Sequence, residues 1–211
     1  TLSLIGTFTA ATAQFGIGEP AQKTVTGTST LADIFIARLR ADTGDLIWVK
    51  TAGGGLAEAV TSAAALWDGD IGITGTFTSA SATFGLGEVN ATTLTNAGIT
   101  TTDVFVAKYS RADGSLQWAK RGGGAFTDNA QSMAMLSNGG AIVVGNFQPP
   151  SASFGDGEAN QTVLTNADAT GANTDLYVAR FNAGGVQAPI APTLSSLPAT
   201  DLSASTLRSE E

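Results

Sequence analysis

The chain has 211 residues, of which 13% are charged, and its formal net charge is −8 with only ten lysine and arginine residues, which are scattered. Because nucleic-acid binding needs clustered Lys and Arg to displace counterions, this balance argues against a nucleic-acid partner. The chain contains no cysteine and no histidine, which excludes disulfides, Cys/His zinc sites, haem ligation, thiol nucleophiles and histidine-based triads. No apolar run reaches the roughly 18 residues of a membrane-spanning helix, so membrane insertion is not expected.

The dominant feature of the sequence is a repeat of about 70 residues that occurs in three imperfect copies. The segment GTFTAATAQFGIGE from Gly6 recurs as GTFTSASATFGLGE from Gly75 and as GNFQPPSASFGDGE from Gly145. Two further motifs accompany it: DIFIARL from Asp33, DVFVAKY from Asp103 and DLYVARF from Asp175, then GDLIWVKTAGGG from Gly44 and GSLQWAKRGGG from Gly114. The third copy lacks the last motif.

Each copy is expected to form a four-stranded antiparallel unit, and the middle copy shows all four strands. The strands are expected at about 57–67, 70–78, 103–109 and 115–121. Asp68-Gly69 is expected to form a two-residue hairpin turn, in which both residues adopt positive φ, and Asn138-Gly139 has the same role in the next copy. In the third strand both faces are apolar, which predicts a sheet packed between neighbouring sheets.

Four strands per unit is the pattern of a β-propeller blade. The predicted fold is therefore an all-β, propeller-like array of four-stranded blades. An insertion at 79–102, which carries the FGxGE motif, makes the repeat longer than ordinary propeller repeats, and the three insertions are expected to form a row of loops. Gly53 to Gly55 and Gly122 to Gly124 are interpreted as connectors to the next blade.

The phase of the repeat predicts an incomplete ring. Residues 1–56 hold strands two to four of a blade, 57–124 hold a complete blade, and 125–182 hold strands one to three with no clear fourth strand. Residues 183–211 are rich in Pro, Ser and Ala and are interpreted as a tail or linker. Three partial blades leave sheet edges and faces open, so the polypeptide is longer, or subunits complete the ring, or the chain joins a filament or complex by strand addition.

These motifs resemble the bacterial β-propeller repeat, also called the seven-bladed propeller repeat, of secreted and surface proteins. The residues that carry the resemblance are GTFTSASATFG from Gly75, LTNAG from Leu94, DVFVAKY from Asp103, and LQWAK from Leu116 with the following glycines. The resemblance covers about residues 1–182. It implies a propeller fold and an extracellular or cell-surface location in bacteria, and it carries over no common enzymatic activity.

The recurring acids are the first candidate site. Calcium takes several oxygen ligands, and a carboxylate-lined surface is one interpretation of Glu19, Glu88 and Glu158 with Asp33, Asp103 and Asp175. The favoured alternative is that each Glu caps its own glycine turn and each Asp bonds nearby backbone amides. Asp42 and Asp45 faintly resemble a calcium loop, but a hairpin turn is favoured there. Asp42, Asp45, Glu88 and Asp103 stay as weak calcium candidates, and no other metal or cofactor is expected.

Tryptophans, recurring basic residues and two asparagines are the remaining candidates. Trp48 and Trp118 are candidates for stacking on sugar rings, but their equivalent positions favour core packing; Trp67 has no equivalent. Arg38, Lys108 and Arg180 are expected to be solvated strand ends or partners of a local acid. Asn90 and Asn160 begin glycosylation sequons in the insertions.

No catalytic site is expected, because the acids recur once per repeat whereas a catalytic pair normally places its two acids in different environments. GxSxG and phosphate-binding glycine motifs are absent from the sequence. The predicted function is a non-enzymatic extracellular or cell-surface structural or interaction module that assembles with protein partners, as a homo-oligomer, filament or larger surface complex. The alternative is a fragment of a carbohydrate-active or calcium-dependent propeller enzyme or binding domain, with carbohydrate as a candidate partner.

Overall fold

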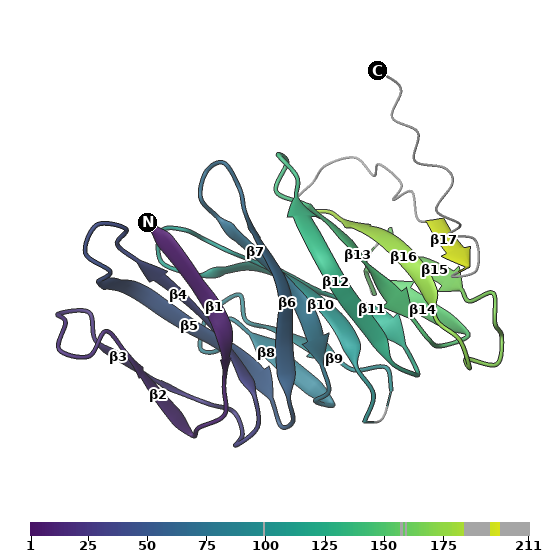
Figure 1. Cartoon of the computed structure of the whole chain (residues 1–211), viewed down its shortest axis with the longest axis horizontal. Coiled ribbons are helices and arrows are strands. Elements are labelled where there is room, and N and C mark those ends of the chain that lie inside the picture. The colour runs from purple at the N-terminus through teal and green to yellow at the C-terminus, as the bar shows by residue number, and fades with distance from the viewer. Residues whose placement is uncertain (99, 157, 159, 184–194, 199–211) are drawn as a thin grey trace.

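The computed structural model describes residues 1–98, 100–156, 158, 160–183 and 195–198, and this part of the chain is all β (Figure 1). The strands of the first repeat are β1 (Leu2–Phe8), β2 (Thr12–Phe15), β3 (Lys23–Thr26), β4 (Asp33–Leu39) and β5 (Leu46–Gly54). Those of the second are β6 (Glu58–Ala65), β7 (Ile71–Phe77), β8 (Ser81–Phe84), β9 (Thr92–Thr95), β10 (Asp103–Tyr109) and β11 (Leu116–Gly124). Those of the third are β12 (Asp128–Met135), β13 (Ala141–Phe147), β14 (Ser151–Phe154), β15 (Thr162–Thr165), β16 (Asp175–Phe181) and β17 (Ser195–Pro198). The described residues contain no helix, and so none long and apolar enough to cross a membrane.

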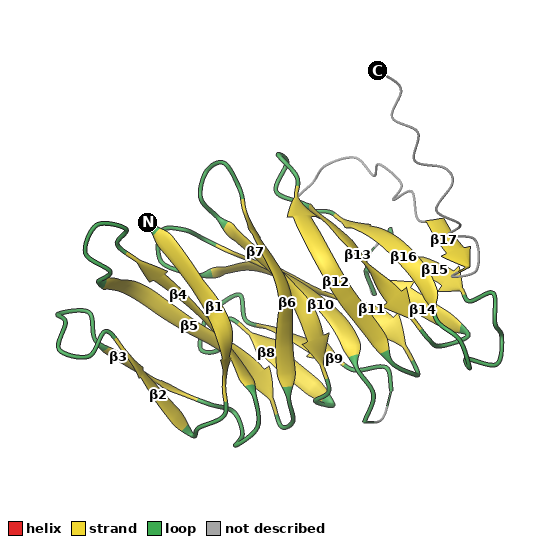
Figure 2. Ribbon diagram, in the orientation of Figure 1, coloured by secondary structure: helices red, strands yellow, loops and turns green. Residues whose placement is uncertain are grey.

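The strands form antiparallel sheets that follow one another in chain order (Figure 2). The second repeat builds a sheet in the order β6-β7-β10-β11, as expected of its four strands, and the hairpin β14–β15 from the third repeat extends it. The first repeat builds β1-β4-β5, which is extended by β8–β9 from the second repeat. The third builds β12-β13-β16-β17, and the hairpin β2–β3 forms a two-stranded sheet by itself. We call the three larger sheets the first, second and third sheet.

The sheets pack face to face, with the second sheet between the other two. One face of the second sheet contributes Ile73 and Phe105 to a core shared with Ile36 of the first sheet. Its other face contributes Val106 to a core shared with Val143 of the third sheet. All seven residues of β10 are buried, which confirms the interpretation of its two apolar faces.

All of the triple glycines except Gly55 are parts of strands rather than connectors, which corrects the expected end of the fourth strand near residue 121. β11 continues to Gly124 and pairs with β14, and β5 continues to Gly54 and pairs with β8. Glycine is required because the incoming strand lies where a side chain would be: a Cβ on Gly124 would be 2.3 Å from the Ser151 carbonyl oxygen. Thus the insertions, expected as a row of loops, are hairpins, and those of the second and third repeats join the preceding sheet.

The Asp68-Gly69 turn also differs from expectation. Gly69 has φ of 89°, but Asp68 is not among the described residues with positive φ. The Leu66 amide donates to the Asp70 carbonyl, so the loop has three residues and ends in a glycine bulge, and Gly139 closes the equivalent turn in the same way. Asp68 is accommodated because only the last loop position needs positive φ.

A fourth strand, which the sequence did not predict, lies in the third sheet. β17 pairs antiparallel with β16, with Asp175 opposite Pro198 and Val178 opposite Ser195. Its proline and its short length hide the usual strand pattern, so the prediction of a tail without a strand was wrong there. Residues 184–194 and 199–211 of the expected tail lie outside the described residues.

One side of the first sheet, here called the leading face, points away from the second sheet and is lined by Leu2, Leu4, Phe35 and Leu39. The pairing of Leu2 with Leu39 places them on one face, opposite Ile36, which packs on the second sheet. Leu2 is 54% exposed and Leu4 49%. The side chains at the same positions of the second sheet, Ile71 and Ile73, are 1% and 0% exposed, because the first sheet covers them.

This difference predicts unequal costs of truncation at equivalent positions. Ile73→Ala should lower the free energy of unfolding by about 2–5 kcal/mol, because it leaves a cavity between two sheets. Leu4→Ala should cost less than about 1 kcal/mol, because its side chain is already half in water. Urea unfolding of the two variants checks this, and equal costs would contradict the exposure of the leading face.

Candidate functional site: the junctions between repeats

The glutamate of the FGxGE motif joins two repeats. Glu88 accepts a hydrogen bond from the Leu116 amide at 2.7 Å, which holds the start of β11 in its own repeat. Its other carboxylate oxygen pairs at 2.6 Å with the Lys50 ammonium from β5 of the preceding repeat. The FGxGE turn is closed by the backbone instead, since the Glu88 amide donates to the Gly85 carbonyl at 2.9 Å. The side chain of Glu88 therefore reaches outward to strands and does not cap its own turn.

The same ion pair occurs at the next junction. Lys120 of β11 lies 2.7 Å from the Glu158 carboxylate of the third repeat. In the first repeat Glu19 makes the intrarepeat bond, accepting from the Leu46 amide at 2.5 Å, but the described residues place no cation within ion-pair distance of it. Lys50 and Lys120, which the sequence analysis did not single out, recur 70 residues apart and could have been recognised from that spacing.

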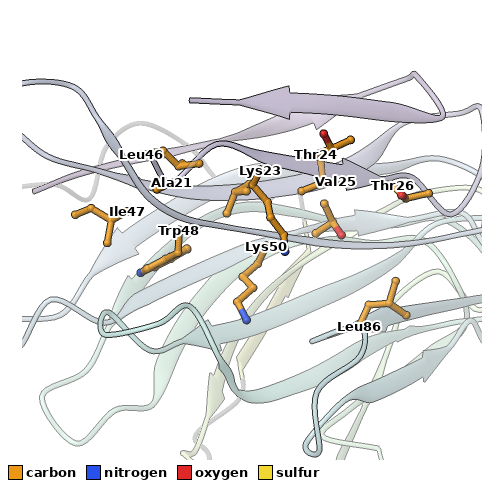
Figure 3. Close-up of a pocket in the computed structure, with 12 residues that line it drawn as sticks. Ala21, Lys23, Thr24, Val25, Thr26, Leu46, Ile47, Trp48, Lys50 and Leu86 are labelled. Atoms are coloured by element: carbon orange, nitrogen blue, oxygen red, sulfur yellow. The ribbon is translucent and has the colours of Figure 1, made fainter. Parts of the chain in front are cut away.

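The lysines line open grooves beside the hairpins. A groove of about 490 Å³ lies between β3 and β5, and Trp48, Lys50 and Leu86 line it (Figure 3). A second groove of about 400 Å³ lies at the equivalent place between β9 and β11, where Lys120 and Glu158 line it. Both grooves are lined by the lysine of a fourth strand and by threonines of the hairpin beside it, and acidic side chains line only the second.

The two equivalent tryptophans are buried, which is the core-packing alternative. Trp48 and Trp118 are each 8% exposed. The Trp48 indole N–H donates to the Arg111 carbonyl at 3.1 Å, and its ring lies where a Cβ on Gly114 would be, 2.6 Å from the ring atom Cε3. Trp67, in contrast, is 86% exposed on its turn. Trp48 therefore covers the turn between β10 and β11 of the following repeat.

Pairs of buried carboxyl groups lie at both junctions. At the second junction Asp103 and Asp128 are both 0% exposed, and the position of a Cβ on Gly123 is 2.6 Å from Asp103 Oδ1 and 2.8 Å from Asp128 Oδ2. At the first junction Asp33 and Glu58, each 1% exposed, take the same places. Glu58 and Asp128, like the lysines, were missed from sequence although they recur 70 residues apart.

The aspartates that begin the third strands bond to loop amides, as the favoured alternative expected. Asp33 accepts from the Thr28 amide, Asp103 from Ala97 and Asp175 from Ala167, at 2.9, 2.8 and 2.7 Å. Asp103 also pairs with Arg121, at 2.7 Å.

Burial changes the acidity of these pairs. Burial raises the pKa of Glu58 to about 7, and the nearby Asp33 charge adds to the effect. Burial raises the pKa of Asp128 to about 8, with a further contribution from Asp103. The pKa of Asp103 is also raised by burial although Arg121 donates to it. The side chains of both pairs are buried under neighbouring residues. Their raised pKa values favour one protonated carboxyl group in each pair.

The expectation that the recurring basic residues are solvated or pair with a local acid holds for Lys108 and fails for Arg38. Lys108 is 6% exposed and pairs with Asp70 at 3.0 Å, which is the local acid partner considered as the alternative. Arg38 is 8% exposed and donates to the Gly69 carbonyl of the second repeat at 3.1 Å. Arg180 is half-buried. Arg38 and Lys108 lie between sheets, because the faces of β4 and β10 that carry them pack on the next sheet, whereas Arg180 lies on the far side of the third sheet, on the same face of β16 as Val178.

The structure does not bring the weak calcium candidates together. Asp42 is exposed and Asp45 half-buried in the turn between β4 and β5, Glu88 binds Lys50, and Asp103 binds Arg121. In the described part of the chain, no three acidic residues are grouped in a way that could hold a metal ion.

The two sequon asparagines lie in the insertion hairpins. Asn90 is exposed, but its side-chain amide also donates to the Leu116 carbonyl, and Asn160 is half-buried.

A scan against protein-family models and a search of curated proteins each found no match to this chain.

The carboxyl pairs predict that stability falls as the pH rises from 5 to 9. Burial raises the folded-state pKa of Glu58 and Asp128 above their ordinary values of 4.5 and 3.8. At a pH between the ordinary and the raised pKa of each carboxyl, the folded state therefore binds more protons than the unfolded state. The stabilisation is complete below the ordinary pKa and is lost as the pH rises through about 7 and 8, at up to about 1.4 kcal/mol per pH unit for each carboxyl.

Urea unfolding at pH 5, 7 and 9 measures this slope. The combined variant Glu58→Gln and Asp128→Asn should flatten it, whereas Asp42→Asn, in an exposed turn, should leave it unchanged. An unaltered slope in the combined variant would show that the pairs do not hold protons.

The Trp48 contact predicts different costs at two equivalent glycines. Gly44 and Gly114 have φ of 82° and 72°, so alanine costs about 1–2 kcal/mol of backbone strain at either position. At Gly114 the new methyl group also overlaps Trp48, which should add about 1–3 kcal/mol, whereas no atom lies within 4 Å of it at Gly44. Thermal unfolding of both variants, and of Gly114→Ala combined with Trp48→Ala, tests the contact; equal losses in all backgrounds would refute it.

Proposed function

We propose that this chain is a non-enzymatic structural or interaction module, extracellular or at a bacterial cell surface, that works by stacking the apolar faces of its sheets on other sheets. In this proposal each repeat is a β-propeller blade. The sheet order β6-β7-β10-β11, the burial of β10 on both faces and the face-to-face cores on either side of the second sheet support it.

The observation that carries the proposal is the exposure of the leading face. Leu2 and Leu4 are about half exposed, while their equivalents in the second and third sheets, Ile73 and Val143 among them, are fully buried under a preceding sheet. Burying two leucine side chains is favourable by about 1.5–3 kcal/mol each when they leave water completely. The leading face therefore has the apolar character that its equivalents in the other two sheets use to pack against a preceding sheet.

The far side of the third sheet has the same character. Val144 and Val178 are 37% and 41% exposed, whereas Val106, at the position of Val178 in the second sheet, is buried against the third sheet. A leading face and a far face of different composition can associate head to tail, which generates rings or filaments rather than a symmetric dimer.

The sequence resemblance to secreted propeller repeats supports the location, and it stays a resemblance of motifs. The contacts do not favour the alternative of a carbohydrate-active or calcium-dependent propeller fragment, because the recurring acids bind lysine, arginine and backbone amides.

Mass measurement by analytical ultracentrifugation tests the proposal on the full chain. The mass should rise with concentration above that of a 21.2 kDa monomer, because the exposed leucines bind a second sheet. Leu4→Lys should reduce the association at least several-fold by placing a charge in the contact. Val89→Lys, a change of the same kind at a fully exposed position off the sheet faces, should not.

A stable monomer at every concentration, with both variants indistinguishable from the natural chain, would argue against association through this face.

A further inference from the structure

At both junctions the fourth strand of one repeat, β5 or β11, contacts the repeat that follows it. At the first junction Trp48 lies on Gly114 and donates to the Arg111 carbonyl, Lys50 pairs with Glu88, and Gly53 and Gly54 pair with β8. All three contacts come from β5 and all three reach groups of the second repeat. The first repeat thus binds the second repeat through a Trp-x-Lys sequence in β5 that is followed by glycines.

The second junction repeats two of these contacts. Lys120 pairs with Glu158, and the strand pairs with β14 through Gly122 to Gly124. Trp118 is buried at the position of Trp48, and its indole N–H has no hydrogen-bond partner among the described residues. The turn that Trp118 would cover runs into residues 184–194, which are outside the described part.

The first repeat has the groups that such a fourth strand contacts, but no fourth strand of a preceding repeat lies against them in the described structure. Glu19 bonds to the Leu46 amide as Glu88 does to Leu116, yet the described residues give it no lysine. No atom lies within 4 Å of the Cβ position of Gly44, which corresponds to Gly114. β2, which corresponds to β8, pairs with β3 alone, so its other edge is unpaired in the described structure.

We propose that the leading face binds a β-strand of another repeat that carries Trp-x-Lys followed by glycines. The lysine pairs with Glu19, the tryptophan covers Gly44, and the glycines pair with β2. The proposal rests on the proposed function and names the occupant of the same face. Its basis is continuity with two interfaces inside the chain: at both of them the lysine meets the glutamate and the glycines meet the hairpin strand, and at the first the tryptophan also meets the turn glycine.

A second copy of the chain does not supply this strand from its third sheet. The fourth place in that sheet is taken by β17, Ser195–Pro198, whose sequence Ser-Ser-Leu-Pro contains neither tryptophan nor lysine. The third sheet of a second copy would cover the leucines without meeting Glu19 or Gly44. The preferred occupant is therefore a repeat with a complete fourth strand, whether in the same polypeptide or in another protein.

The test joins a copy of residues 57–139 to the amino terminus of the full chain. This segment adds one complete repeat and then a copy of β12 with its turn, and Thr1 then takes the place of Gly140, so that Leu2 continues as Ala141 does. The added repeat should raise the midpoint of thermal unfolding and slow hydrogen exchange in β1. The higher midpoint follows from covering Leu2 and Leu4, and the slower exchange follows both from that and from pairing of the copied β12 with β1, as β6 pairs with β7.

The ion pair is tested by a double-mutant cycle in the extended chain. Lys120→Gln in the added copy, and Glu19→Gln, should each lower the midpoint by about 2 °C, and together by no more than either alone. Gln at position 19 keeps an acceptor for the Leu46 amide, so Glu19→Gln should leave the unextended chain unchanged. Gln131→Ala in the added copy, at an exposed position, is the control.

The tryptophan contact is tested by Trp118→Phe in the added copy, which keeps an aromatic core residue but removes the indole. It should cancel the extra cost of Gly44→Ala in the extended chain.

If the added repeat protects β1 but the substitutions act independently, the strand-specific contact is refuted while the proposed function stands. If the added repeat leaves both β1 exchange and the midpoint unchanged, the proposed function fails with it.

Discussion

Burial of the third strand on both of its faces is the constraint on which the rest of this structure depends. β10 carries valines on one side and Phe105, Ala107 and Tyr109 on the other, and none of these side chains is exposed. A sheet with two apolar faces is stable only when it has a neighbour on each side. The second sheet has both neighbours inside the chain. The first and third sheets have one large neighbour each. The β2–β3 hairpin covers part of the outward face of the first sheet, where Phe15 packs on Phe35, and the uncovered parts account for the exposed leucines and valines.

Polar groups at the junctions adapt to that burial in two ways. Lys50 and Lys120 extend from a strand to a glutamate of the next repeat, so each charge lies close to its partner. The pairs formed by Asp33 with Glu58 and by Asp103 with Asp128 have less compensation, and only the second has an arginine. Taking carboxyl groups out of water without full pairing favours their protonated form, so the junctions are the part of the fold that weakens as the pH rises.

Much of this arrangement could be predicted from the sequence because the repeat supplied three views of one unit. The strand from Asp103 to Tyr109, its two apolar faces and the equivalence of Trp48 and Trp118 followed from local pattern. The pairing of Gly122 to Gly124 with β14 could not, since a glycine run looks the same in a connector and in a strand that another backbone approaches closely. Likewise, the partners of Lys50 and Glu58 lie in neighbouring repeats, and the pattern within one repeat does not show them.

The insertion hairpins have a further consequence. Because β8–β9 extends the first sheet and β14–β15 extends the second, the outer edges of these two sheets are closed by the repeat that follows each of them in the chain. An array built this way has a direction, because each hairpin extends the sheet that precedes it, and its two ends are chemically different. A whole repeat inserted in the middle would meet only interfaces that already exist. Such an array can lengthen or shorten by complete units in evolution without a new contact surface having to arise.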